Sequence, residues 1–139
     1  MSEPAGIHIF SLQEARKTLP LIRPIVQDVT DCHQALREHL EGVRNQVLTD
    51  QNSPPDPSME NTSPKLREYR EDLKEYVLEI YDLGAEIHDF DRGRIDFPAR
   101  LGHRVVYLCW DLADDDILYW HDTYAACHKR QSIDDEDFD

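Results

Sequence analysis

Two stretches of the chain carry apolar residues at every seventh position, and this repeat constrains the fold more than any other feature. In residues 21–48 the two series are Ile22, Val29, Leu36 and Val43, then Val26, His33, Leu40 and Val47. In residues 66–87 they are Leu66, Leu73, Ile80 and Ile87, then Tyr69, Tyr76 and Leu83. Two apolar positions in every seven are typical of helices that pack side by side. We therefore predict two antiparallel helices whose apolar seams bury one another.

Caps, prolines and a glycine mark the ends of the predicted helices. Ser11 and Glu14 have the spacing of a capping box, and Pro20 should end or kink the short helix that begins there. Gly84 is well placed to stop the second seam helix. Residues 49–61, TDQNSPPDPSMEN, contain three prolines and no periodicity. This segment is predicted to be a mobile polar loop between the two seam helices.

After Gly84 the apolar period changes to two, which is typical of strands. Four segments alternate in this way: EIHDFD (86–91), RIDF (94–97), HRVVYLCW (103–110) and DILYWH (116–121). The predicted fold class is therefore α+β, with a long, coiled-coil-like antiparallel helical hairpin packed on a small antiparallel meander. Residues 1–133 should form this single domain, and the acidic residues 134–139 a disordered tail.

Composition excludes several classes of partner. The 139 residues include 15 Lys and Arg against 29 Asp and Glu, a net charge of -14. Such a surface repels nucleic acid and anionic membranes. No stretch reaches the about 18 apolar residues that a membrane span needs. The start, MSEPAGIHIF, does not resemble a signal peptide, and the three cysteines form no CxxC pair, so we expect a cytoplasmic protein with reduced thiols.

The segment 105–122, VVYLCWDLADDDILYWHD, gathers most of the residues that could carry chemistry. Trp110 and Trp120 are best explained as sheet packing, because aromatic side chains dominate small cores. Cys109 lies between two apolar residues, where a cysteine behaves as a small hydrophobe.

A sharper hypothesis places His121 beside Asp96, with Asp114 or His103 around a shared pocket. A histidine and carboxylates can hold a divalent metal or exchange protons with a substrate. The alternative is a structural histidine bonded to a backbone carbonyl or a carboxylate. No HExxH or HxH motif is present to favour the metal.

Four segments resemble a small bacterial family, domain of unknown function 2203: FSLQEARKTLPLIRPIV (10–26), DLGAEIHDFDRGRIDFPA (82–99), GHRVVYLCWDL (102–112) and ILYWHD (117–122). With the helices between them they cover about residues 8–131. The resemblance implies no activity. It indicates positions that recur in the motifs: Asp96, Phe97, Pro98, Cys109, Trp110, Trp120, His121 and Arg130. Two departures are Ala113-Asp114, where the family has Gly and Glu, and Ala126, near which it has Gly.

Two function classes follow from these observations. The first is a non-catalytic cytosolic interaction protein that associates with itself or a protein partner, because part of a seam should remain uncovered. The second is a small-ligand or divalent-metal-binding protein, or an enzyme built on such a site. Its predicted ligand-binding residues are Asp96, Trp110, Asp114, Trp120, His121 and Arg130. Its weaker metal candidates are His121, Asp96 and His103. Arg130 would hold an anionic group, and the sequence identifies no cofactor.

Overall fold

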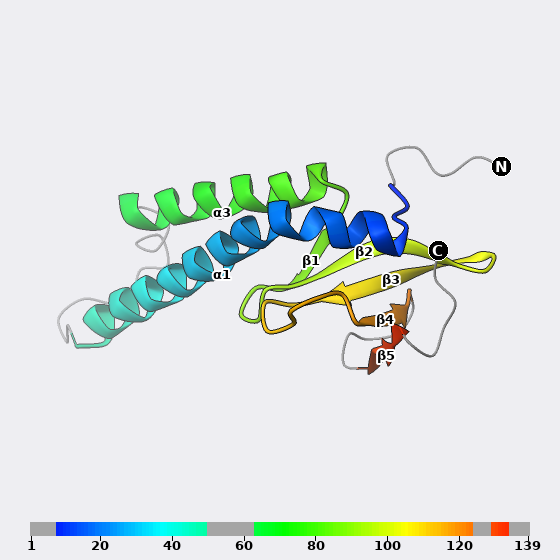
Figure 1. Ribbon diagram of the computed structural model, residues 1–139. Coiled ribbons are helices and arrows are strands. Elements are labelled where there is room, and N and C mark those ends of the chain that lie inside the picture. The colour runs from blue at the N-terminus through cyan, green and yellow to red at the C-terminus, as the bar shows by residue number, and fades with distance from the viewer. Residues whose placement is uncertain (1–7, 50–62, 124–128, 134–139) are drawn as a thin grey trace.

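The computed structural model describes residues 8–49, 63–123 and 129–133. In these residues it contains two helices and five strands (Figure 1). Their bounds are α1 Leu12–Thr49, α3 Pro64–Asp82, β1 Glu86–Asp89, β2 Arg94–Leu101, β3 Arg104–Trp110, β4 Tyr119–Asp122 and β5 Gln131–Ser132. The predicted α+β class is confirmed. The predicted tail and most of the predicted loop lie outside the described residues.

The two seam helices form an antiparallel hairpin, but they differ in length. α1 has 38 residues and α3 has 19, which correspond to about 57 Å and about 28 Å. α3 therefore cannot cover the whole seam of α1, and the sheet covers its N-terminal part. Ile22, Val26 and Val29 are fully buried in one core with residues of the sheet. Figure 1 shows the N-terminal half of α1 lying over β2 and β3.

The predicted end of a short first helix at Pro20 is wrong, because α1 continues through both Pro20 and Pro24. Both prolines are exposed and lie four residues apart, so they share one solvent-facing side of the helix. The carbonyls that lose their intrahelical partners on this side can be hydrated, which lowers the cost of proline. The predicted cap is present: the Glu14 backbone N–H donates to Ser11 Oγ at 3.0 Å.

The sheet is an antiparallel meander in the order β1-β2-β3-β4-β5, as predicted except for β5. The register pairs Asp96 with Cys109 and Tyr107 with His121. Because successive side chains alternate between the faces, these four residues lie on the outer face, away from α1. The inner face carries the buried Ile95, Phe97, Leu108, Trp110 and Trp120.

The N-terminal arm extends the edge of the sheet beyond β1. Phe10 forms a parallel bridge with Ala99, and its N–H donates to the Pro98 carbonyl at 2.7 Å. The N–H that Pro98 lacks would point to this same edge, so the proline removes no hydrogen bond between β2 and β3. The Phe10 ring packs edge-on against Phe97, with centroids 5.1 Å apart. Gly84 ends the α3 segment with φ +96° beneath this ring.

Candidate metal centre

A buried carboxylate stands at the centre of the outer face. Asp96 is in the middle of β2, and the register places Cys109 of β3 beside it. On β4 the partner of Cys109 is Tyr119, and His121 lies two residues further along the same face. All three side chains are buried, with 0%, 0% and 3% of their surfaces exposed in the order Asp96, Cys109, His121. A polar group this deep requires partners.

Two histidines share one oxygen of Asp96. Nε2 of His121 lies 2.9 Å and Nε2 of His88 lies 2.7 Å from Asp96 Oδ2. The other oxygen, Oδ1, is buried and has no hydrogen-bond partner in the described part of the chain. The carboxylate is therefore satisfied on one side only, and a buried acceptor left in this way is costly.

Three different ligand atoms meet at this point. One ligand atom each from Asp96, Cys109 and His121 lie within 4.8 Å of one another. Cys109 forms no disulfide in the described residues, and its side chain is hydrogen-bonded to Arg130. Nitrogen, sulfur and oxygen donors at this spacing form a set that can hold a metal ion.

The backbone fixes the orientation of the His121 ring. Nδ1 lies 2.8 Å from the carbonyl oxygen of Asp122, which can only accept, so Nδ1 carries a proton. Without a metal, Nε2 must also carry a proton to bond Asp96, and the ring is an imidazolium. With a metal, Nε2 would offer its lone pair, and the Nδ1 bond would hold the ring in place as outer-shell carbonyls do.

The pKa values of the cluster reflect these contacts. Burial alone would lower the pKa of His121, but hydrogen bonds to Asp96 and to the Asp122 carbonyl raise it. The hydrogen bond to Asp96 raises the pKa of His88 against a smaller effect of burial. Burial would raise the pKa of Asp96, yet the hydrogen bonds from both histidines lower it. In the metal-free cluster these contacts favour the protonated form of both rings and the ionised form of the carboxylate.

His88 reaches the cluster through an irregular strand. The register of β1 against β2 shifts between Ile87 and Asp89, as at a β-bulge, and β1 lies at the edge of the sheet. Bulges commonly redirect a side chain near a functional site. The His88 side chain is 37% exposed, unlike the three buried groups.

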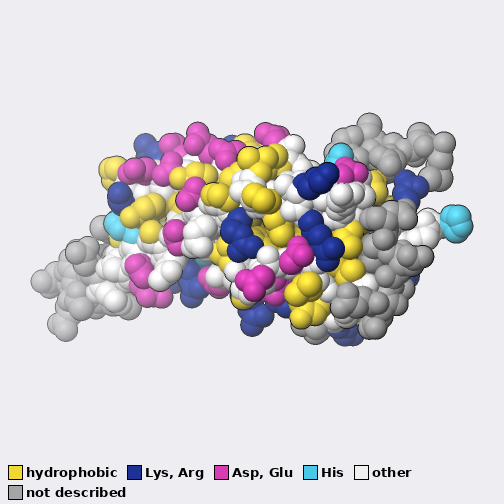
Figure 2. Space-filling view, in the orientation of Figure 1, with side chains coloured by type: hydrophobic (Ala, Val, Ile, Leu, Met, Phe, Trp, Pro, Cys, Tyr) yellow, Lys and Arg dark blue, Asp and Glu magenta, His cyan; other side chains and the backbone are white. Residues whose placement is uncertain are grey.

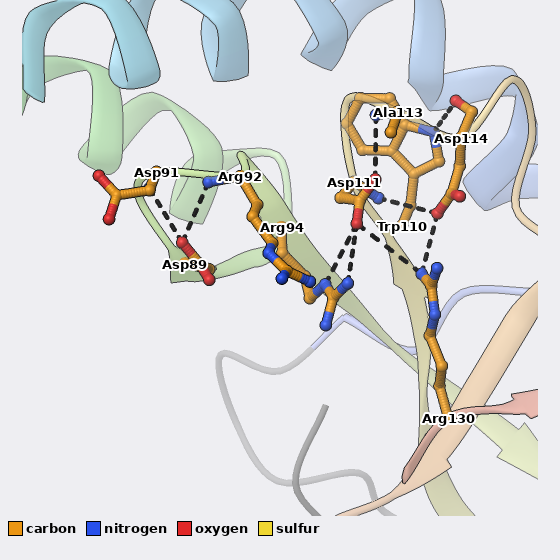
Figure 3. A network of polar contacts seen from close by, with 9 residues as sticks. All are labelled: Asp89, Asp91, Arg92, Arg94, Trp110, Asp111, Ala113, Asp114 and Arg130. Atoms are coloured by element: carbon orange, nitrogen blue, oxygen red, sulfur yellow. Dashed lines mark hydrogen bonds and ion pairs between the residues drawn. The ribbon is translucent and has the colours of Figure 1, made fainter. Parts of the chain in front are cut away.

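A second polar network lies at the end of β3 (Figure 3). Arg94 binds Asp111 Oδ2 at 2.9 Å, and Arg130 binds Asp114 Oδ2 at 2.9 Å. The Trp110 indole N–H donates to the Asp114 carbonyl at 3.0 Å. These contacts tie the loop after β3 to the strands on either side.

The structure unites some of the predicted site residues and separates others. Asp96 and His121 are hydrogen-bonded, and His121 also contacts the Asp122 carbonyl, so these contacts fit both the sharper hypothesis and the structural histidine that was its alternative. Trp110 and Trp120 lie on the inner face, with Arg23 of α1 over the Trp110 ring at 4.9 Å, so they do not wall a pocket around Asp96. Their interpretation as sheet packing agrees with their place in the core.

The remaining predicted residues lie elsewhere. Asp114 and Arg130 form an ion pair, so the positive charge that was predicted to hold an anionic group is already neutralised by Asp114. Arg130 still borders the cluster: burial would lower its pKa, but hydrogen bonds with Asp114 and with the Cys109 side chain raise it. His103 is exposed in the turn between β2 and β3, five residue pairs from the Asp96–Cys109 pair, or roughly 17 Å along the strands. His103 therefore takes no part in the site.

Sequence reasoning missed two members of the cluster. From its neighbours in the sequence, Cys109 was interpreted only as a small hydrophobe. It shares a strand face with Tyr107, and the hydroxyl of this tyrosine was a signal that the face differs from the apolar core. His88 was in a predicted strand, but its position depends on the register shift in β1, which no periodicity indicates.

The fold and the site thus define a class of protein. It is an α+β protein with a buried Asp–Cys–His cluster on the outer face of its sheet. Residues 8–133 match the family described as an uncharacterized conserved protein, DUF2203, and the chain belongs to this family. The match confirms the resemblance seen in the four motifs. No curated protein and no solved structure matches the chain. In the described residues, neither helix has the length and apolar character needed to cross a membrane.

Proposed function

We propose that this protein binds a transition-metal ion of the zinc class, with Asp96, Cys109 and His121 as ligands. The observation that carries the proposal is the buried, unpartnered Oδ1 of Asp96 beside a thiol and an imidazole. A cation would supply the partner that the carboxylate lacks. The sites of Mg²⁺ and Ca²⁺ are built from oxygen ligands, so a thiol and an imidazole favour a softer ion.

The spacing of the donors suits a small ion. In a tetrahedral zinc site the ligand atoms lie about 3.5 Å apart, because each is about 2.0 to 2.3 Å from the metal. The three atoms here lie within 4.8 Å of one another. A contraction of about 1 Å would bring the three donors to the separations of a zinc site. A buried thiolate ligand also fits a reducing compartment such as the cytoplasm.

A metal-free network of His88, Asp96 and His121 is the competing explanation. It accounts for Asp96 Oδ2, which receives both imidazoles. It leaves Oδ1 of Asp96 without a hydrogen-bond partner in the described residues. Metal binding would give a partner to this oxygen as well, with the neighbouring Cys109 and His121 as further ligands.

Self-association, the other predicted role, has less support. The first part of the α1 seam, Ile22, Val26 and Val29, is buried, while Leu36, Leu40 and Val43 further along are half-buried. The most exposed apolar side chains on the helices are Leu21, Leu78 and Tyr81, at 60%, 51% and 51%. Figure 2 shows apolar side chains interspersed with acidic and basic ones on the visible face.

Metal binding is tested by elemental analysis of the full-length, untagged protein. The chain is stripped with a chelator under reducing conditions and equilibrated with Zn²⁺ buffered in the micromolar range. We expect one zinc per chain. Cys109→Ser and His121→Gln should weaken zinc binding by on the order of a hundredfold, because second-shell changes alone cost up to that much.

Cys32→Ser is the matched control, since Cys32 donates to the Tyr69 carbonyl on the helical hairpin and lies outside the cluster. It should bind zinc like the wild type. Circular dichroism verifies that each variant is folded. A wild-type protein that takes up no zinc, or a folded Cys109→Ser variant that binds it as tightly as the wild type, overturns the proposal.

A further inference from the structure

The three proposed ligands leave one tetrahedral position unfilled. Structural zinc sites are closed by four protein ligands, whereas reactive sites keep three and leave the fourth position to water or a substrate. In the described residues the group of mutually close ligand atoms contains Asp96, Cys109 and His121 and does not include His88. His88 approaches only the carboxylate, at 2.7 Å from Oδ2.

His88 lies between the cluster and the solvent. Its side chain is 37% exposed while those of the three ligands are buried. β1 is a four-residue edge strand with a register shift at this residue, so the side chain can move without disturbing the central strands. The carboxylate of Glu86 is 3.8 Å from His88 Nε2 and offers the ring another partner on the same strand.

Tyr107 stands next to both histidines on the outer face. Its ring centroid is 5.4 Å from that of His121 and 6.2 Å from that of His88. Its side chain is hydrogen-bonded to the Glu86 carboxylate of the edge strand β1. A molecule bound at the fourth position that replaces this carboxylate would receive the hydrogen bond of the phenol.

We infer that the metal centre is open, and that a small monoanion or a water molecule takes the fourth position on the side where His88 and Tyr107 border the cluster. This inference rests on the proposed metal binding. In an open centre, His88 is a neighbour of the ion that an incoming ligand displaces. Tyr107 is a positioning residue for that ligand. The site would then belong with reactive metal centres, in which an external ligand exchanges at the ion.

The test uses the full-length protein loaded with one equivalent of Co²⁺ and titrated with sodium azide. Co²⁺ reports its coordination by visible absorption, and a thiolate ligand adds a charge-transfer band. We expect azide to change the visible spectrum saturably. Tyr107→Phe should weaken azide binding several-fold with no loss of cobalt.

His88→Ala should bind azide roughly three- to tenfold more tightly, because a competitor for the position is removed. His103→Ala, at the far turn, should match the wild type. Absence of cobalt uptake contradicts the proposed function itself. Normal cobalt uptake with a spectrum that azide leaves unchanged overturns the open site alone, as does loss of the metal in a folded His88→Ala variant.

Discussion

At the scale of single residues, the molecule concentrates its unusual chemistry at Asp96. A buried carboxylate is tolerated only when charged or hydrogen-bonding groups surround it, and here two imidazoles bond one oxygen. The surrounding ionisable groups are Glu86 on β1, Tyr107 and Cys109 on β3, and Asp122 on β4. Removing the carboxylate would leave two charged rings without their shared partner.

The metal-free protein should lose stability as the pH rises above neutrality. The pKa values of His88 and His121 are raised in the folded protein. Their contribution to the free energy of unfolding is therefore complete below about pH 6.5 and is lost as the pH rises through the raised pKa values. The lowered pKa of Asp96 means that its contribution is present above about 3.9 and is lost as the pH falls through the lowered value. The cluster therefore stabilises the fold most between about pH 4 and 6.5.

Urea unfolding in the presence of chelator measures this dependence. The free energy of unfolding should be lower at pH 8.5 than at pH 6. Asp96→Asn should lower it by about 3 kcal/mol at pH 6 and flatten the slope, because a buried charge pair is broken. Asp115→Asn, in an exposed position, should change it by no more than about 0.5 kcal/mol. A slope that is identical in wild type and Asp96→Asn contradicts the assigned network.

At the scale of elements, some features could be predicted and others could not. The sevenfold repeat identified both helices, because side chains four residues apart share a face whatever surrounds them. The helix end predicted at Pro20 was wrong, since the cost of proline depends on whether water reaches the freed carbonyls, which is a tertiary property. β5 is two residues long and pairs only with β4, so it has no period to detect.

The end of α3 offers a test at this scale. Gly84 has φ +96°, and a Cβ there would lie 3.0 Å from the Phe10 ring, so Gly84→Ala should destabilise the protein by about 1 to 2 kcal/mol. Gly42 is in α1, and a methyl group added there would have nothing within 4 Å, so Gly42→Ala should stabilise the protein by up to about 1 kcal/mol. Chemical denaturation of both variants measures the two effects. Equal effects of the two substitutions would refute the close packing at Gly84.

At the scale of the whole molecule, α1 connects the helical hairpin to the sheet. It packs on α3 along one part of its length and on the sheet along another. In the described residues no helix lies on the outer face of the sheet, and the polar residues of three strands gather on that face because side chains alternate along each strand. The sequence predicted the pairing of His121 with Asp96, because both lie on predicted strands of one meander. The position of Trp110 and Trp120 on the opposite face from this pair could not be predicted in the same way. It depends on the register of the strands, which decides which residues face α1.

The central claim, that Asp96, Cys109 and His121 hold a metal ion, is tested most directly by X-ray absorption at the zinc edge. The sample is the full-length chain loaded with one equivalent of zinc. The account predicts one sulfur at about 2.3 Å together with nitrogen and oxygen neighbours at about 2.0 to 2.2 Å. A shell of oxygen alone, or a spectrum unaltered by Cys109→Ser in a folded protein, would contradict it.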